Sequence, residues 1–257
     1  MDISPMLLTE VDDDTILDKG WIYQIKENGQ RAIIHIKGGK IVGIRGRSNN
    51  PLLYCYPEFK DIRFDFDTAI LDGEIVVLKN GKSVFYGGID QRRSVPSPAR
   101  LKELSATIIV FDIIQFEQEV LVYKPYKDRL AVLEQKILPT EKVRVVKSTN
   151  DGRVLWQHVV AEDQEGLVAK DPNGLYELGK RSKQCIKIKN YKYVDVVVEK
   201  TEPNPKGTKI YAHTEIGGRE IAVECQRSGS FNINVGDNVR VKYLDIVGGH
   251  LVQPTNW

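Results

Sequence analysis

The sequence predicts an α+β protein: a larger domain of antiparallel sheets with a few helices, followed by a small all-β barrel. Short strands and glycine-containing turns fill residues 21–86, and apolar residues at helical spacing occur in a few later segments, such as residues 126–133. From Tyr193 onward no helical period is present. We therefore expect two domains, residues 1–190 and residues 191–257.

The bulk composition is that of an ordinary globular protein, with 41% hydrophobic and 28% charged residues. No apolar run approaches the ~20 residues that cross a bilayer, and the first residues lack the basic region of a signal peptide. Three widely spaced cysteines predict neither a disulfide framework nor a zinc site. We expect a cytoplasmic protein with no membrane partner. A net charge of +2 excludes a strongly basic nucleic-acid coat but allows local basic surfaces.

The first strand covers residues 21–26 and ends at Lys26, before a turn at Asn28-Gly29 and a second strand that begins near residue 32. A lysine attacks an electrophile only in its neutral form, which a neighbouring cation favours. Arg31 is such a cation and can also bind phosphate through two nitrogens. Taken alone, a lysine at the end of a strand is commonplace.

Further elements follow in order. The pattern predicts a hairpin at residues 37–40, a strand at 69–78 with a turn at Asn80-Gly81, and a helix capped by Ser97 with Pro98 in its first turn. A buried strand is predicted at 107–114, and helices near 126–133 and after a cap near Asn150 or Asp151. Further strands are predicted at 167–170 and 186–189. Lys187 and Lys189 alternate with apolar residues, so both point to one strand face and suit a polyphosphate.

The remaining segment, of about 65 residues, reads as short strands at 194–198, 209–213, 220–225 and 238–243. Gly217-Gly218 and Gly248-Gly249 separate some of them. This pattern predicts a small five-stranded barrel such as an OB-fold.

Several short motifs occur in a fixed order. They are Lys26-Glu27-Asn28-Gly29-Gln30-Arg31, the arginine-containing Arg45-Gly46-Arg47-Ser48-Asn49, Asp72-Gly73-Glu74, the aromatic Phe111, Glu165-Gly166-Leu167-Val168-Ala169-Lys170, and Lys187-Ile188-Lys189. Each alone has an ordinary structural explanation. Together they resemble the covalent nucleotidyltransferases, which comprise DNA ligases, RNA ligases and mRNA capping enzymes. The similarity is greatest to ATP-dependent DNA ligases, and among these to the ligase domain of prokaryotic end-joining ligase D proteins.

The resemblance implies a fold and a set of roles. The fold would be a nucleotidyltransferase (adenylation) domain followed by an OB-fold domain. Lys26 would be the nucleophile that becomes adenylylated by ATP, and Glu74 and Glu165 would hold Mg²⁺ or Mn²⁺. The residues expected to contact the nucleotide are Gln24, Ile25, Arg31, Arg47, Glu74, Phe111, Lys187 and Lys189.

The implied activity is the sealing of a nick between a 5′-phosphate and a 3′-hydroxyl through a lysyl-AMP intermediate, in DNA break repair by end joining. The expected partner is nicked double-stranded DNA. A nick that contains RNA is an alternative substrate that the sequence does not exclude. A Ku-like end-binding protein and end-processing enzymes are implied by the resemblance alone. ATP is expected rather than NAD, because no nicotinamide-binding domain precedes residue 21.

Three positions depart from the family pattern. Asn28 replaces an aspartate, and Gln24 stands where a glutamate is common, although its carbonyl can still accept a hydrogen bond from the adenine amino group. The segment 251–254 carries no lysine or arginine, with Val252 at the place of an arginine that orients pyrophosphate. The alternatives are an RNA ligase, a GTP-dependent capping-type enzyme and a degenerate, non-catalytic nucleic-acid-binding module.

Overall fold

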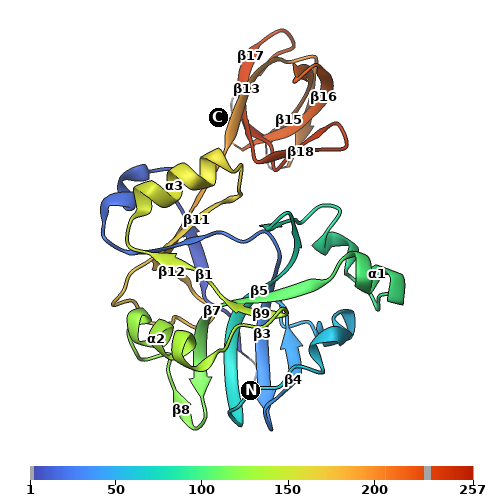
Figure 1. Cartoon of the computed structure of the whole chain (residues 1–257). Coiled ribbons are helices and arrows are strands. Elements are labelled where there is room, and N and C mark those ends of the chain that lie inside the picture. The colour runs from blue at the N-terminus through green and yellow to red at the C-terminus, as the bar shows by residue number, and fades with distance from the viewer. Residues whose placement is uncertain (1–2, 206, 229–232, 257) are drawn as a thin grey trace. The chain divides into compact units, whose positions relative to one another are not determined.

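The computed structural model describes residues 3–205, 207–228 and 233–256 (Figure 1). The chain divides into two compact units, Met1–Ile188 and Lys189–Trp257. The first unit combines strands and a few helices, and the described part of the second contains strands and no helix. The α+β class expected from the sequence is confirmed.

A seven-stranded sheet forms one half of the first unit, in the order β4-β3-β5-β7-β8 with β6 beside β5 and β9 beside β7. Its long central strands run antiparallel, and β9 runs parallel to β7. The strands are β3 (Gln30–Lys37), β4 (Lys40–Arg45), β5 (Thr68–Lys79), β6 (Lys82–Ser83), β7 (Ala106–Phe116), β8 (Glu119–Val120) and β9 (Val143–Val145).

A five-stranded sheet, in the order β1-β12-β11-β2-β10, forms the other half and is assembled from distant parts of the chain. β2 lies antiparallel to both β10 and β11, and β1 lies parallel to β12. The strands are β1 (Leu7–Glu10), β2 (Ile22–Ile25), β10 (Ser148–Thr149), β11 (Gly166–Lys170) and β12 (Arg181–Lys189). Figure 1 shows β11 and β12 on the opposite side of the unit from β3 and β4.

Side chains alternate between the two faces of the seven-stranded sheet. Ile33 packs with Met6, Val168 and Cys185 in a cluster that joins the two sheets. Ile34, its neighbour in β3, packs on the other face into the largest core cluster. Helix α1 (Pro98–Glu103), helix α2 (Tyr126–Lys136) and the short 3-10 segments η2 (Leu53–Cys55), η3 (Pro57–Phe59) and η4 (Ile89–Gln91) border that second face. The site described below lies between the two sheets.

Two of the α-helices in the described residues begin at a capping side chain, whereas α2 follows Pro125 without a side-chain cap hydrogen bond. Ser97 caps α1 by accepting a hydrogen bond from the Arg100 backbone, as predicted. Asp151 caps α3 (Gly152–Ala161) in the same way.

The apolar side of α3 and the 3-10 segment η1 (Asp14–Asp18) cover the outer face of the five-stranded sheet, where Val159 packs against Tyr23 and Leu167. Among the described residues, no helix is long and apolar enough to span a membrane.

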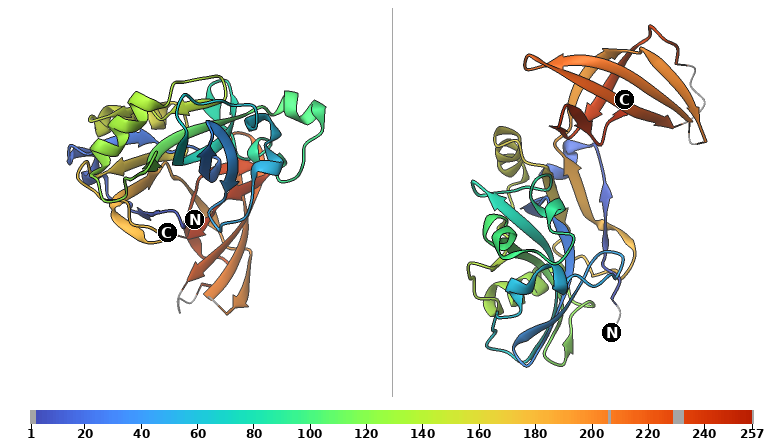
Figure 2. Two further views of the ribbon diagram at one scale, coloured as in Figure 1. Left: turned by 90° about the horizontal axis from the view of Figure 1, so that it is seen from below. Right: turned by 90° about the vertical axis from the view of Figure 1, so that its right-hand side faces the viewer.

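The second unit is a strongly curved sheet in the order β13-β17-β20-β16-β15-β14, with β18 and β19 attached (Figure 2). Val196, Ile210, Val223 and Val241 belong to its buried core. The strands are β13 (Lys192–Val197), β14 (Lys200–Asn204), β15 (Gly207–Ile216), β16 (Arg219–Ser228), β17 (Asn238–Tyr243), β18 (Asp245–Val247), β19 (His250–Val252) and β20 (Thr255–Asn256).

This unit has more strands than the five expected. β13, β15, β16 and β17 overlap the four strands found by sequence pattern. β14 was missed because it is polar and contains Pro203, and β18 to β20 because two or three residues carry no alternation.

Candidate active site

A pocket of about 580 Å³, partly open to solvent, lies between the two sheets of the first unit. Both sheets supply its walls. The lining residues are Met6, Leu8, Gln24, Ile25, Lys26, Glu27, Arg31, Asp72, Glu74, Phe111, Asp112, Val146, Val168, Lys170 and Cys185.

Lys26 and Glu165 meet because β2 and β11 are paired. Ile25 lies opposite Leu167 in this antiparallel ladder, and the Lys26 backbone N–H donates to the Gly166 carbonyl at 2.9 Å. The next residue back along the chain, Glu165, then reaches the lysine, with its Oε1 at 2.7 Å from Lys26 Nζ. Both side chains are largely buried, at 19% and 10% exposed.

Two further carboxylates lie close to this ion pair. Glu74 lies opposite Arg31 across β3 and β5. Burial raises the pKa of Glu74 to about 7, although the charges of Lys26 and Arg31 oppose this. Burial also raises the pKa of Glu27. The negative charge of Glu165 adds to both effects, so a cation between these carboxylates would relieve the electrostatic cost.

Arg31 is held by Asp72. Its Nε and Nη2 donate to the two oxygens of Asp72, each at 2.5 Å, and Nη2 also donates to the Met6 carbonyl at 3.1 Å. Tyr176 donates to the same carboxylate at 2.5 Å. The guanidinium lies 4.9 Å from the centre of the Phe111 ring. Arg31 thus links β3 to β5 and to Met6, the residue before β1. The sequence predicts a phosphate contact from the same side chain.

The ring of Phe111 is half-buried on β7, whose neighbouring residues are buried. Arg31 contacts the ring, and Lys170 Nζ lies 4.8 Å from its centre. A partly exposed aromatic on a buried strand is unusual for a core residue, and here the ring forms part of the pocket wall. This placement fits the stacking role expected for Phe111.

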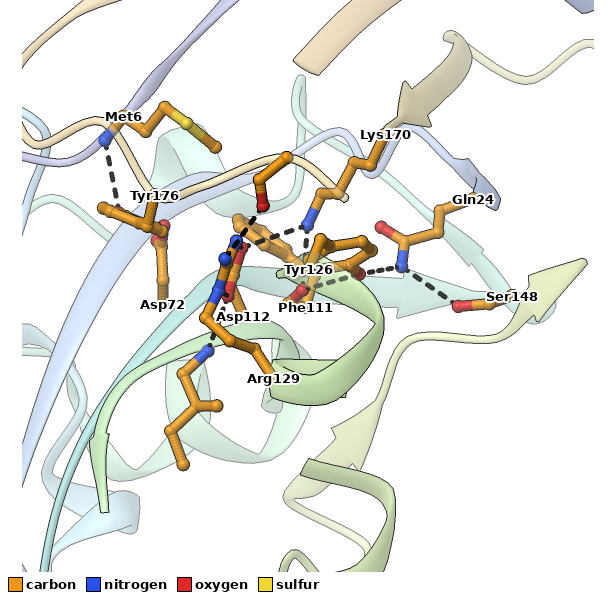
Figure 3. A network of polar contacts seen from close by, with 12 residues as sticks. Met6, Gln24, Asp72, Phe111, Asp112, Tyr126, Arg129, Ser148, Lys170 and Tyr176 are labelled. Carbon is orange, nitrogen blue, oxygen red and sulfur yellow. Dashed lines mark hydrogen bonds and ion pairs between the residues drawn. The ribbon is translucent and has the colours of Figure 1, made fainter. Parts of the chain in front are cut away.

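Gln24, which is 2% exposed, belongs to a buried polar network (Figure 3). Its Nε2 donates to Tyr126 Oη at 2.6 Å and to Ser148 Oγ at 3.0 Å. Tyr126 Oη and Lys170 Nζ both donate to the Phe111 carbonyl, at 3.0 and 2.8 Å. Burial lowers the pKa of Lys170.

The other end of the network is an ion pair between Arg129 and Asp112. The Arg129 Nε and Nη2 atoms donate to the two Asp112 oxygens at 2.7 and 3.0 Å, and Lys170 Nζ lies 3.7 Å from Asp112 Oδ2. Arg129 and Asp112 are each 1% exposed. This pair anchors helix α2, and therefore Tyr126, to strand β7.

A second pocket, of about 910 Å³ including open solvent, shares Leu8, Lys26, Arg31 and Glu74 with the first. Its other lining residues are Leu7, Gly29, Gln30, Arg47, Arg181 and Lys187. Lys187 pairs with Glu10 at 2.9 Å. The second pocket is rich in cations, as expected of a phosphate-binding region, because its lining includes Lys26, Arg31, Arg47, Arg181 and Lys187.

The structure thus brings most of the predicted site residues together. Gln24, Ile25, Lys26, Arg31, Arg47, Glu74, Phe111 and Lys187 line one or both pockets, and Glu165 contacts Lys26. Lys189 is not among the residues that line either pocket. It is the last residue of β12 and the first residue of the second unit, and its Nζ donates to Gln253 Oε1 at 2.9 Å and to Tyr191 Oη at 3.2 Å.

Sequence reasoning gave no role to several of the residues described above, among them Asp72, Asp112, Tyr126, Arg129, Lys170 and Arg181. Arg181 had a visible signal, since it belongs to the basic run between residues 179 and 192. Asp72 and Lys170 stand inside recognised motifs. Asp112 lies in the strand predicted at residues 107–114 and Tyr126 begins the helix predicted near 126–133, but no local pattern indicated that these residues and Arg129 form polar contacts at the site.

A lysine that lines both an aromatic-walled pocket and a cationic pocket is the arrangement expected of a covalent nucleotidyltransferase. Residues 5–189 match the ATP-dependent DNA ligase domain, and the chain belongs to this family. The predicted family and the predicted ATP-dependent DNA ligase activity are thereby confirmed.

Individual proteins similar to this chain are also DNA ligases or ligase-like proteins by name. The SPbeta prophage-derived DNA ligase-like protein LigB of Bacillus subtilis is 29% identical over 199 residues, covering 77% of this chain and 71% of that protein. The multifunctional non-homologous end joining protein LigD of Mycolicibacterium smegmatis is 29% identical over 199 residues, covering 77% of this chain but 25% of that protein. The crystal structure of the ligase domain of M. tuberculosis LigD shares the fold, with a TM-score of 0.65 at 18% identity, covering 99% of this chain and 94% of that chain.

Proposed function

We propose that this protein joins DNA strands at a nick with Lys26 as the covalent nucleophile. The observation that carries the proposal is the position of the Lys26 side chain, which lines both pockets. In this arrangement the nucleoside of ATP occupies the aromatic-walled pocket. The phosphates extend toward the cationic pocket, and the α-phosphorus lies beside the lysine amine.

The reaction has three phosphoryl or nucleotidyl transfers. The neutral amine of Lys26 attacks the α-phosphorus of ATP, its N–P bond forms, and the bond to pyrophosphate breaks. The AMP then moves to the 5′-phosphate at the nick, which restores the lysine. Attack of the 3′-hydroxyl on that activated phosphate joins the strands and releases AMP. Catalysis of such transfers depends on alignment and charge neutralisation.

Each side chain has a defined task in this scheme. Phe111 stacks on adenine and the Gln24 carbonyl accepts from its amino group. Glu165, at 2.7 Å from Lys26 Nζ, is placed to take the proton that the amine must lose. Arg47 and Lys187 bind phosphates, and Arg181 joins them because it lines the same pocket.

Glu74 and Glu165 fit a divalent cation. Carboxylate oxygens are the ligands that Mg²⁺ prefers, and Mg²⁺ is usually held by one or two carboxylates together with substrate phosphates and water. The ion, Mg²⁺ or Mn²⁺, would neutralise phosphate charge.

The biological setting that we propose draws on one relative and on the family resemblance. The M. smegmatis protein is named for non-homologous end joining. We extend to this chain a role in DNA break repair in the cytoplasm, beside a Ku-like end-binding protein and end-processing enzymes. Comparing nicks with DNA or RNA at the 3′ side identifies the strand that the enzyme prefers.

The test is covalent labelling by ATP. Wild-type protein incubated with ATP labelled in the α-phosphate and Mg²⁺ should retain label on a denaturing gel. Lys26→Ala should retain none, while Lys102→Ala, which removes an exposed lysine on α1, should label normally. Full labelling of Lys26→Ala would refute the assignment of the nucleophile.

A further inference from the structure

Gln24 presents a problem of orientation that a carboxylate does not. A side-chain amide has a donor end and an acceptor end, and either end can face a ligand. Adenine carries an amino donor at position 6, and guanine carries a carbonyl acceptor there. The end of Gln24 that faces the base therefore decides which purine can form a hydrogen bond with it.

The protein fixes this choice through Tyr126. Tyr126 is 1% exposed, and its hydroxyl donates its one proton to the Phe111 carbonyl at 3.0 Å. The phenolic oxygen can then only accept, so it selects the NH₂ end of Gln24, at 2.6 Å.

Ser148 adds a second contact from the neighbouring strand. It lies directly opposite Gln24 in the β2–β10 ladder, and its Oγ accepts from the same nitrogen at 3.0 Å. Among the described residues, no hydrogen bond reaches the Gln24 Oε1 atom. Figure 3 shows the nitrogen directed to both hydroxyl groups and the oxygen on the other side of the amide.

We propose that Tyr126 and Ser148 are positioning residues that hold the Gln24 amide with its carbonyl toward the base, and so set the preference for ATP over GTP. This inference rests on the proposed function, in which the base lies in the pocket that Gln24 lines. Tyr126 has the larger effect on the orientation of the Gln24 amide, because Ser148 is exposed and water can replace its hydroxyl group.

This mechanism predicts that the effect of removing the Tyr126 and Ser148 hydroxyl groups on purine preference depends on the residue at position 24. Once both hydroxyl groups are removed, the amide can rotate and offer NH₂ to the guanine carbonyl. A glutamate at position 24 has no donor end when ionised, so its preference does not depend on orientation. Removal of the two hydroxyl groups should therefore change purine preference when residue 24 is glutamine and leave it unchanged when residue 24 is glutamate.

The experiment measures initial rates of covalent labelling with α-labelled ATP and GTP. The variants are Gln24→Ala, Tyr126→Phe, Ser148→Ala, the Tyr126→Phe/Ser148→Ala double variant, and that double variant combined with Gln24→Glu, with Gln24→Glu alone as its reference. Because one hydrogen bond changes affinity by about tenfold or less, we expect the GTP-to-ATP ratio to rise about tenfold in the double variant and less in each single variant.

A merely structural role for Tyr126 would lower both labelling rates and leave their ratio unchanged. That outcome, or an equal change of ratio in the Gln24→Glu background, would overturn the proposal. Its failure is distinguishable from failure of the proposed function. Absence of any labelling of the wild type would refute the function. An unchanged ratio in Gln24→Ala would show that the base does not contact residue 24.

Discussion

Glu165 Oε1 lies 2.7 Å from Lys26 Nζ, and the backbone fixes this contact. The Lys26 N–H donates to the carbonyl of Gly166, the residue that follows Glu165, at 2.9 Å. This backbone hydrogen bond holds the two chain segments side by side, so that the two side chains can reach each other. The lysine and its carboxylate are therefore prearranged before any nucleotide binds.

The carboxylates beside Lys26 should be needed for sealing. Glu74→Ala and Glu165→Ala each remove a carboxylate that is proposed to bind the metal ion close to the lysine. We expect rates of nick sealing to fall on the order of a hundredfold. The measurement is sealing across a Mg²⁺ titration. Glu162→Ala, which removes an exposed carboxylate paired with Lys82, is the matched control. Wild-type rates in both variants would show that these carboxylates are only structural.

Phe111 should contribute to nucleotide affinity more than to turnover. Phe111→Leu keeps apolar volume but removes the ring face, and stacking of a base on an aromatic side chain contributes about 1–3 kcal/mol. We expect the KM for ATP in self-adenylylation to rise about tenfold or more, with a smaller change in kcat. An unchanged KM would place the adenine elsewhere.

Lys170 should make stability depend on pH in the alkaline range. Burial lowers its folded-state pKa below the ordinary value of 10.5, so the unfolded chain binds the proton more tightly. The destabilisation is full below the folded-state pKa and disappears as the pH rises to 10.5. The stability of the wild type relative to Lys170→Met should therefore increase with pH within that window.

The measurement for Lys170 is urea denaturation of both proteins at several pH values up to 10.5. Lys102→Met, at an exposed position on α1, controls for general effects of removing a lysine. A stability difference that stays constant with pH would mean that Lys170 titrates normally.

The C-terminal segment should limit self-adenylylation. The family resemblance places a basic residue at Val252, whereas residues 251–254 contain no lysine or arginine. Final joining does not involve pyrophosphate, so a pre-adenylylated nick should be sealed faster than the full reaction from ATP proceeds. Val252→Arg should accelerate adenylylation.

One neighbour complicates that substitution. Val252 lies opposite Asp245 in the β18–β19 ladder, and an arginine there can pair with this carboxylate. Val252→Arg should therefore be measured with and without Asp245→Asn, and Asp245→Asn alone is the control. Equal rates on the two substrates, with no gain from either combination, would show that the segment has no such role.

Sequence reasoning succeeded where the signal is local. The turn at Asn80-Gly81 is a case, because both residues adopt the positive φ angles that such turns require, 52° and 81°. Ser97 and Asp151 cap their helices because capping involves residues only a few positions apart. The order of the motifs gave the family for the same reason, since each motif is a short continuous stretch.

The polar network could not be predicted in this way. Tyr126 Oη reaches Gln24 across 102 positions of sequence, and Arg31 reaches Asp72 across 41. Such contacts depend on strand order and on the angle at which a helix packs, which no short pattern specifies. The position of Lys189 shows the same limit, because its motif is local but its hydrogen bond to Gln253 is not.

The central claim is that AMP becomes bonded to Lys26. The direct measurement is mass spectrometry of the intact protein after incubation with ATP and Mg²⁺, followed by peptide mapping under conditions that preserve a phosphoramidate. The account predicts one AMP per chain, located on Lys26 and discharged by nicked DNA. AMP on another residue, or a protein that seals nicks without ever carrying AMP, would contradict it.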